Sequence, residues 1–242
     1  MRKLLLIALS LFGLSSYAQL SLDNSGVAST IDFENTVPGV NEGRFNASGL
    51  VPSPAAGQLN SNAWEFEGLS DGNTAFGGSY TSGDYTRGAS AGGVFSGGIY
   101  AFEVSGDTAL GIQPTGSDWT PGSITLRTFN HTGSTLDSLR LEYTLIVNND
   151  GDRGNTFNPS YSVDRVNYTA LNSLNDTSIE VAAMTVNWVA IQKDTTFPIS
   201  VADGDSIFFK WDGADALGGG NRDEFAIDDI SITPYASPAS TN

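Results

Sequence analysis

The sequence predicts an all-β protein, an antiparallel β-sandwich of jelly-roll type. Short segments in which apolar and polar residues alternate recur along the chain, and this period of two is typical of half-buried strands. Almost no segment keeps a helical period, and glycine-rich turns separate the alternating segments. Many short strands joined by turns favour two packed sheets around one core.

The first predicted strands cover residues 29–34 and 63–67, and each alternates apolar with acidic side chains. Residues 35–62, between them, are rich in Gly, Pro, Asn and Ser and show no period, so we expect a long loop there. Residues 71–98 contain nine glycines interleaved with aromatic residues, and no helix persists in such a composition. We therefore expect loops joining short strands over residues 71–98.

The middle of the chain holds the clearest alternation. Strands are predicted at residues 99–104, 109–113 and 123–130. The longest alternating segment, residues 136–149, is predicted to be a central strand with one face toward solvent. An Asn-Asp-Gly-Asp turn at residues 149–152 ends it.

Shorter strands are predicted after that turn, at residues 160–164, 168–171, 187–192, 196–201 and 206–211. The last two flank residues 202–205, whose Ala-Asp-Gly-Asp sequence is a hairpin signal. A closing strand is predicted at residues 225–233, and we expect the polar tail 235–242 to be frayed. These elements make one β-sandwich domain over residues 19–234.

The first 18 residues have the pattern of a secretory signal peptide. Residues 2–3 are basic, residues 4–14 are apolar, and a Ser-Tyr-Ala sequence precedes Gln19. We expect cleavage before Gln19 and a secreted or cell-surface location. No later segment approaches the roughly 20 apolar residues that a membrane helix needs, so we expect no membrane insertion after signal cleavage.

The composition restricts the partners. The formal net charge is −16, so nucleic acid and anionic membranes are repelled and we expect no nucleic-acid partner. The chain has no cysteine and one histidine, His131, which gives little support to a zinc site or to a catalytic triad. An exported chain of this kind holds its fold without disulfides.

The closing strand places a carboxylate among apolar side chains. A period of two puts Ala226, Asp228, Ile230 and Ile232 on one face. A carboxylate on that face must be paired, hydrogen-bonded or bound to a metal ion, because burying it alone is very costly. Arginines such as Arg222 offer one kind of partner.

Residues 222–231, Arg-Asp-Glu-Phe-Ala-Ile-Asp-Asp-Ile-Ser, resemble the closing strand of MAM-like and concanavalin-A-like jelly-roll domains. The similarity extends over residues 70–233 to a group of exported bacterial β-sandwich proteins that mostly lack an assigned function. It rests also on residues 97–102, 111–114, 121–126 and 149–153. The resemblance implies a fold much more strongly than an activity.

Jelly-roll carbohydrate-binding modules commonly hold a structural calcium ion between an acidic first strand and the last strand. The resemblance therefore implies Asp32, Glu34 and Asp228 as calcium ligands, and calcium accepts six to eight oxygens in irregular geometry. Two other interpretations stay open: Asp228 pairs with Arg222 or Arg153, or it accepts backbone N–H bonds across a loop.

Two further groups of residues are candidates for carbohydrate chemistry. Tyr80, Tyr85 and Trp119 lie in or beside loops, where an exposed ring can stack on the C–H face of a sugar. Glu65 and Glu67 share one strand face and are candidates for acid/base hydrolysis, although a solvated acidic face explains them better.

The leading prediction is a secreted, non-catalytic β-sandwich that binds an extracellular glycan or acts in adhesion or matrix, with a structural calcium ion. The alternatives are a sandwich-fold enzyme that degrades polysaccharide through paired carboxylates, and a purely structural surface protein. The sequence does not specify the sugar or the partner.

Overall fold

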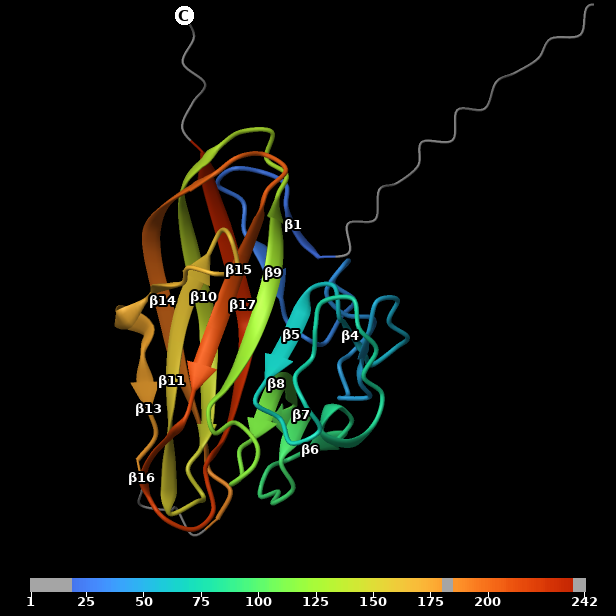
Figure 1. The fold of residues 1–242 in the computed structure, drawn as a ribbon, viewed down its shortest axis with the longest axis vertical. Coiled ribbons are helices and arrows are strands. Elements are labelled where there is room, and N and C mark those ends of the chain that lie inside the picture. Colours follow the sequence, from blue (N-terminus) through green and yellow to red (C-terminus); the bar gives the residue numbers. More distant parts are fainter. Residues whose placement is uncertain (1–18, 180–184, 237–242) are drawn as a thin grey trace, which may run out of the picture.

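The computed structural model describes residues 19–179 and 185–236, and it has the predicted all-β sandwich fold (Figure 1). The helical elements of this part are two 3₁₀ turns, η1 (Gly83–Tyr85) and η2 (Asn172–Leu174). Within the same residues, no helix has the length and apolarity to cross a membrane. The predicted signal peptide, residues 1–18, lies outside the described residues.

One layer, here named the β9 sheet, has the strand order β1-β9-β15-β11-β12, with β5 beside β9 and with β13 and β16 beside β11. Its strands are β1 (Leu20–Leu22), β5 (Trp64–Glu67), β9 (Gly122–Asn130), β11 (Arg153–Ser162), β12 (Thr169–Ala170), β13 (Asp176–Thr177), β15 (Ser206–Gly213) and β16 (Asp215–Gly218).

The other layer, the β10 sheet, has the order β14-β10-β17-β8-β7-β6, with β2 beside β17. Its strands are β2 (Ser29–Ile31), β6 (Ala89–Ser90), β7 (Gly98–Val104), β8 (Asp107–Gln113), β10 (Leu136–Asn148), β14 (Trp188–Val201) and β17 (Glu224–Ala236). The long strands of both layers stand side by side in Figure 1, and the loops of the first hundred residues lie to one side of them.

The main core lies between the two sheets and is rich in aromatic side chains. Trp64, Trp211 and Phe209 from the β9 sheet and Tyr143 from the β10 sheet are almost fully buried in it. The alternation predicted for the central strand is confirmed, because Leu139, Leu141, Tyr143 and Leu145 of β10 all belong to this core. Burial of one such side chain contributes about 1.5–3 kcal/mol, so this core accounts for much of the stability.

The sequence between the first two predicted strands is more structured than expected. It forms a small parallel sheet of β3 (Leu50–Val51) and β4 (Leu59–Asn60), and Val40 and Phe45 are buried with it in the main core. These apolar residues come singly or in one adjacent pair among glycines, prolines and polar residues, so they produce no period in the sequence.

The predicted hairpin at residues 202–205 is wrong. The segments 187–192 and 196–201 form one continuous strand, β14, which belongs to the β10 sheet, whereas the following β15 belongs to the β9 sheet. The turn therefore passes from one layer to the other. An Asp-Gly turn determines where the chain reverses, but not whether the next strand pairs with the previous one.

The closing strand β17 departs from the predicted period of two. Its pairing with β10 shifts between Glu142 and Thr144, and Asp229 has a φ of 49°. This β-bulge adds one residue, so Ile227 and Ile230 both face the main core although their numbers differ by three. Asp228 pairs with Thr144 and lies on the opposite face, so the prediction that it shares the inner apolar face is wrong.

The C-terminal boundary also differs. Tyr235 and Ala236, which we expected in a frayed tail, continue β17 and pair with β10. The amide of Ala236 donates a hydrogen bond to Ser25 Oγ at 2.9 Å. Residues 237–242 of the predicted tail lie outside the described residues.

Candidate functional site

The predicted calcium ligands lie in one region of the fold, on the outer side of the β10 sheet. Asp228 is 2% exposed, and Glu34 lies close enough to raise its pKa electrostatically. Asp107 and Asp229 also lie within this electrostatic range. The cluster therefore has more carboxylates than the three that the sequence suggested.

The three predicted ligands accept hydrogen bonds from different groups. Asp32 accepts from the backbone amide and side chain of Asn35, at 3.2 and 3.0 Å. Glu34 accepts from the backbone amide of Thr108, and Asp228 Oδ1 accepts from the amide of Asp229 at 2.8 Å. No group of three or more Asp, Glu and His side chains that could hold a metal ion occurs within residues 19–179 and 185–236.

The acidic cluster holds protons more tightly than ordinary carboxyl groups do. Burial, followed by the proximity of other carboxylates, raises the pKa of Asp228 to about 8. Burial together with a hydrogen bond to Asp107 raises the pKa of Glu34 to about 7. The predicted arginine pairing is wrong for Asp228: Arg153 binds Asp215, and Arg222 is held by other groups.

The aromatic candidates were chosen for exposure, and this assumption is wrong for two of them. Trp119 is fully buried, with its ring centroid 5.0 Å from that of Phe225. Tyr85 is 7% exposed, and its hydroxyl donates to the Gly72 carbonyl at 2.9 Å. Tyr80 is half-buried against Tyr85. The loops that carry these rings fold back onto the core.

The pair of glutamates proposed for hydrolysis lies on the outer face of the β9 sheet. Glu65 is 6% exposed, forms an ion pair with Arg165 and accepts from the amide of Phe76 at 3.3 Å. Glu67 is exposed and accepts from Ser123 Oγ at 3.2 Å. Glu65 thus has partners that give it a structural role.

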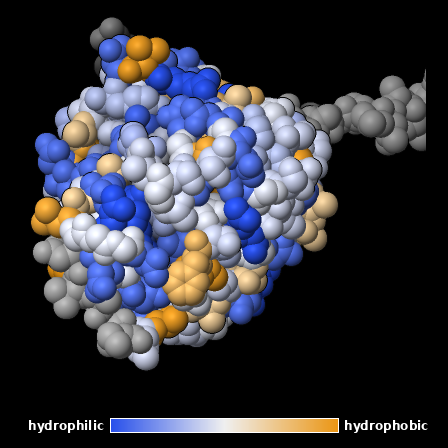
Figure 2. All heavy atoms as spheres, turned by 60° about the horizontal axis from the view of Figure 1, so that its bottom comes forward, coloured by the Kyte–Doolittle hydropathy of each residue, from blue (hydrophilic) through white to orange (hydrophobic). Residues whose placement is uncertain are grey.

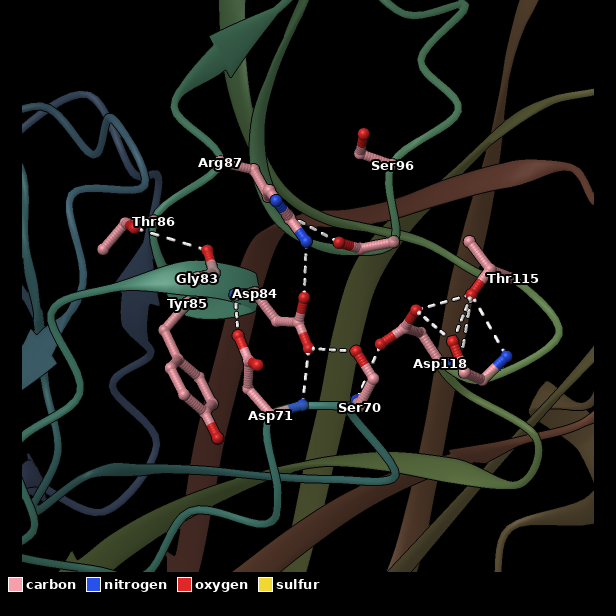
Figure 3. A network of polar contacts seen from close by, with 12 residues as sticks. Ser70, Asp71, Gly83, Asp84, Tyr85, Thr86, Arg87, Ser96, Thr115 and Asp118 are labelled. Atoms are coloured by element: carbon pink, nitrogen blue, oxygen red, sulfur yellow. Dashed lines mark hydrogen bonds and ion pairs between the residues drawn. The ribbon is translucent and has the colours of Figure 1, made fainter.

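A network of three carboxylates, of which those of Asp84 and Asp118 are buried, connects the loops of residues 70–87 and 115–118 (Figure 3). Asp84, which is 1% exposed, forms an ion pair with Arg87 at 2.5 Å and accepts from Ser70 Oγ and the Asp71 amide, each at 2.8 Å. Asp71 in turn accepts from the Asp84 amide at 2.8 Å.

The same network continues through Asp118. Its carboxylate accepts from the amide of Ser70 at 2.7 Å and from the hydroxyl of Thr115 at 2.5 Å. Burial alone would raise the pKa of Asp118, but these hydrogen bonds lower it below its usual value. We name Ser70, Asp71, Asp84, Arg87, Thr115 and Asp118 the Asp84 network. It holds residues 70–87 against residues 115–118.

Arg222 fixes the other side of the same loop. Its side chain comes from the segment before β17 and is 3% exposed. Nη1 donates to the carbonyls of Thr115 and Trp119, at 3.1 and 2.9 Å, and Nε donates to Asn155 Oδ1 at 2.6 Å. The third nitrogen, Nη2, is buried and has no hydrogen-bond partner among the described residues.

A cavity of about 140 Å³ opens beside Arg222. It is lined by Phe95, residues 113–116 and residues 220–222, and we name it the end cavity. Gln113 is 3% exposed, and its side-chain amide Nε2 donates hydrogen bonds to the carbonyls of Pro114 and Arg222, at 2.7 and 3.2 Å. Its Oε1 is buried and lacks a partner in the described part of the chain. Two residues that line one cavity therefore each carry a buried polar atom without a hydrogen-bond partner in the described residues.

Phe95 projects into solvent from a well-anchored loop. It is 74% exposed, and among the described residues it is the one aromatic side chain in the set of large, exposed hydrophobic residues. The buried carboxylate of Glu224 accepts from the amides of Gly93 and Val94 at 2.9 and 2.6 Å. On the other side of Phe95, Tyr100 donates its hydroxyl to the Ser96 carbonyl at 2.8 Å.

The view onto this end of the molecule shows hydrophobic residues gathered in its lower half, within a mainly hydrophilic surface (Figure 2). The exposed hydrophobic side chains of the described chain include Phe95, Val186, Val189 and Leu217. Val186 lies next to the loop of Phe95, since its Cγ2 is 3.2 Å from the position that a Cβ on Gly93 would take. The surroundings of Phe95 are therefore partly apolar.

A larger hollow of about 370 Å³ lies beside the β3–β4 segment. Prolines and polar residues line it, among them Pro38, Pro52, Asn41 and Glu42, and no aromatic side chain does. Asn41 Oδ1 is buried without a partner in the described residues. This hollow therefore has one residue with an unpartnered polar atom, and it has no aromatic ring on which a sugar could stack.

No pattern in the sequence indicated the end cavity as a site. Phe95 lies in the glycine-rich region that we predicted only as loops, and Gln113 ends a predicted strand. Arg222 was identified as a cation that could pair with Asp228, and its buried position was not foreseeable. The one sequence signal for this site was Phe95 itself, a large aromatic residue in a glycine-rich loop that has no alternating pattern to place it in the core.

No protein-family model and no curated protein sequence matches the chain. Solved structures of similar fold include a CBM4 structure, with 15% identity, a TM-score of 0.35 and coverage of 72% of this chain and 96% of that one. A carbohydrate-binding module specific for non-crystalline cellulose, CBM28, has 10% identity, a TM-score of 0.37 and coverage of 81% and 97%. The N-terminal cellulose-binding domain of β-1,4-glucanase C from Cellulomonas fimi has 14% identity, a TM-score of 0.33 and coverage of 73% and 91%. Similarity at this level does not indicate which residues of this chain bind a ligand.

Proposed function

We propose that this protein binds carbohydrate without catalysis, and that the end cavity is its binding site. The observation that carries the proposal is a cavity lined by an exposed, anchored aromatic residue and by two residues that each have a buried polar atom without a partner. Carbohydrate sites need these two kinds of group, because a sugar ring has an apolar C–H face and a rim of hydroxyl groups.

Each residue has a distinct role in this proposal. The Phe95 ring stacks on the C–H face of one sugar, Gln113 Oε1 accepts a hydrogen bond from a hydroxyl, and Arg222 Nη2 donates one to a sugar oxygen. Leaving a buried polar group without a partner costs about 1–3 kcal/mol, so a ligand that supplies the partners recovers that free energy. The anchoring of the loop by Glu224 and Tyr100 keeps the ordering cost of binding low.

The size of the cavity limits what enters it. A volume of about 140 Å³ is roughly ten times the 10–15 Å³ that one water molecule requires by the same measure. We infer that a single sugar residue occupies the cavity, with any further residues of the glycan extending over the surface around Phe95.

A glycan array tests the proposal, with isothermal titration calorimetry on the glycans it selects. We expect Phe95→Ala to weaken the binding of a selected oligosaccharide by about two- to tenfold, since an aromatic contact is worth about 0.5–1.5 kcal/mol. Val166→Ala is the matched control, because Val166 is 78% exposed and does not line the cavity. Absence of any glycan binding, or equal affinity of the Phe95→Ala and Val166→Ala variants, would contradict the proposal.

We further propose that the protein is exported and meets its glycan outside the cell, in adhesion or in a matrix. The support for this is the leader pattern of residues 1–18 together with an acidic, cysteine-free mature sequence. Fractionation of the producing cells tests the location: recovery of a chain that begins at Gln19 in the medium or on the cell surface is expected, and an uncleaved chain in the cytoplasm would refute it.

Calcium binding by Asp32, Glu34 and Asp228 also stays a prediction. The oxygen donors suit calcium, but their carboxylates do not converge as they lie here, so calcium would require them to rearrange. A cation that binds only the folded chain raises its melting temperature. We expect a higher melting temperature in millimolar calcium than in EDTA, and Asp228→Asn should abolish the difference. An identical melting temperature in both would remove calcium from the account.

A further inference from the structure

We propose that the end cavity selects a sugar that carries a carboxylate, that is, a uronic acid residue. This inference rests on the proposed carbohydrate function and names the class of sugar that the same cavity takes. It follows from the charge of the cavity lining and from the two kinds of atom left without partners.

The lining of the end cavity has a charge opposite to that of the chain. The formal net charge of the protein is −16, yet Arg222 is the charged residue among those that line the cavity, and no Asp or Glu lines it. The hollow beside β3 and β4 contrasts with this cavity, since Glu42 lines it. A cationic lining in so acidic a chain favours an anionic ligand.

Arg222 is a buried cation that binds neutral groups. Its hydrogen-bond acceptors are backbone carbonyls, the amide oxygen of Asn155 and the hydroxyl of Thr120. Asp215 lies near enough to act on it electrostatically, but both oxygens of Asp215 are bound by Arg153. Within the described residues no carboxylate forms an ion pair with Arg222.

A buried guanidinium gains most from an anionic partner. Hydrogen bonds between a guanidinium and a carboxylate are about twice as strong as bonds between neutral groups. The free Nη2 carries two hydrogens that a carboxylate can accept. A neutral hydroxyl would satisfy its hydrogen-bonding capacity but would leave the buried charge without an ion-pair partner.

Gln113 separates a uronic acid from a simple anion. Its free Oε1 is an acceptor and needs a donor from the ligand. Acetate and fully ionised inorganic anions offer acceptors only. A uronic acid offers a carboxylate for Arg222 and ring hydroxyls for Gln113, and its C–H face matches Phe95.

The acidic surface restricts the length of such a ligand. At physiological ionic strength the Debye length is about 8 Å, so the carboxylates of the wider surface repel the parts of a polyanion that extend beyond the cavity. We therefore expect short acidic oligosaccharides, or glycans with isolated uronic acid residues, to bind better than long polyuronates.

Calorimetry with matched ligands tests the inference on the unmodified mature protein. The ligands are trimers of galacturonic and mannuronic acid, each compared with the carboxyl-reduced trimer of the same backbone, at 0.15 M salt. At least one acidic trimer is expected to bind about tenfold more tightly than its reduced form. Phe95→Ala should weaken that binding, and Val166→Ala should leave it unchanged.

Each contrary result identifies a different failure. Equal affinity for the acidic and reduced trimers overturns the uronic acid inference and leaves carbohydrate binding in place. Binding of acetate or inorganic phosphate without binding of any sugar overturns both the inference and the proposed function.

Because Arg222→Lys removes the hydrogen bonds that hold residues 115–120 and can unfold the chain, ¹⁵N spectra of the arginine side chains provide the second readout. Acidic trimer that binds without shifting the Arg222 resonances refutes the inference.

Discussion

The Asp84 network and the end cavity are neighbours, but they differ in whether their buried charged and polar groups have hydrogen-bond partners. Both are built on residues 113–118, and both bury charged or strongly polar side chains. In the network, the Asp84 carboxylate has an arginine, a hydroxyl and an amide as partners. In the cavity, Arg222 Nη2 and Gln113 Oε1 have none among the described residues. Burial of a charged residue therefore does not by itself indicate a binding site. At the end cavity, unpartnered polar atoms occur in residues that line the same cavity as an exposed aromatic ring.

This comparison predicts that variants of the network lose stability. Asp84→Ala leaves Arg87 without its carboxylate and removes the acceptor of two further hydrogen bonds, so we expect the free energy of unfolding to fall by about 3 kcal/mol. Urea unfolding measures it. Asp152→Ala is the control, because Asp152 is exposed, and it should change the free energy by less than about 0.5 kcal/mol. A loss as small as that of the control would mean that the network is not what holds these loops.

The acidic cluster near Asp228 is a third arrangement, in which carboxylates are buried beside one another. Because the pKa of Asp228 is about 8 in the folded chain and ordinary in the unfolded chain, the folded state binds the extra proton between these values. Its stability should therefore fall as the pH rises from about 4 to about 8, and Glu34, with a pKa of about 7, should add to the fall.

Asp228→Asn removes the largest part of this dependence. We expect the variant to be about 1–2 kcal/mol more stable than the unmodified protein at pH 8 in EDTA, and similar to it near pH 4. Thermal or urea unfolding over this pH range measures the effect, with Asp152→Asn as the control. A variant whose stability changes with pH as steeply as that of the unmodified protein would show that Asp228 is not the titrating group.

The smallest expected change in stability is at Phe95. Because its side chain is 74% exposed, Phe95→Ala should change the free energy of unfolding by less than about 0.5 kcal/mol, although it weakens glycan binding. Urea unfolding of the same samples used for calorimetry decides this. A large loss of stability would show that Phe95 stabilises its loop. The cavity would then not differ from the Asp84 network, whose residues are expected to stabilise the fold.

The regular parts of the fold were predictable from the sequence, because strands leave a local signal. The alternation in β10 gave both its extent and its inner face, and the turns at glycine and aspartate were placed correctly. What failed depends on contacts between distant segments. The turn at residues 202–205 does not specify the sheet to which β15 belongs, and the bulge at Asp229 reverses the face of Asp228 without any change in composition.

The candidate site was less predictable than the fold. The family resemblance grouped Asp228 with Glu34 as calcium ligands, and the two lie within electrostatic range of each other, but Asp228 is not on the face that the sequence predicted. It took Trp119 and Tyr85 for exposed residues because they lie near turns, but burial depends on where a loop folds back. The partners of Arg222 come from residues 115–120 and from Asn155, so its unpartnered nitrogen was visible only in three dimensions.

Chemical-shift mapping of the isotope-labelled mature protein during titration with a glycan from the array tests the central claim most directly. The account predicts that the largest shifts occur at Phe95, Gln113 and Arg222 and in the loops around them. Shifts confined to the hollow near Asn41, or to the outer face of the β9 sheet around Phe76, would contradict it.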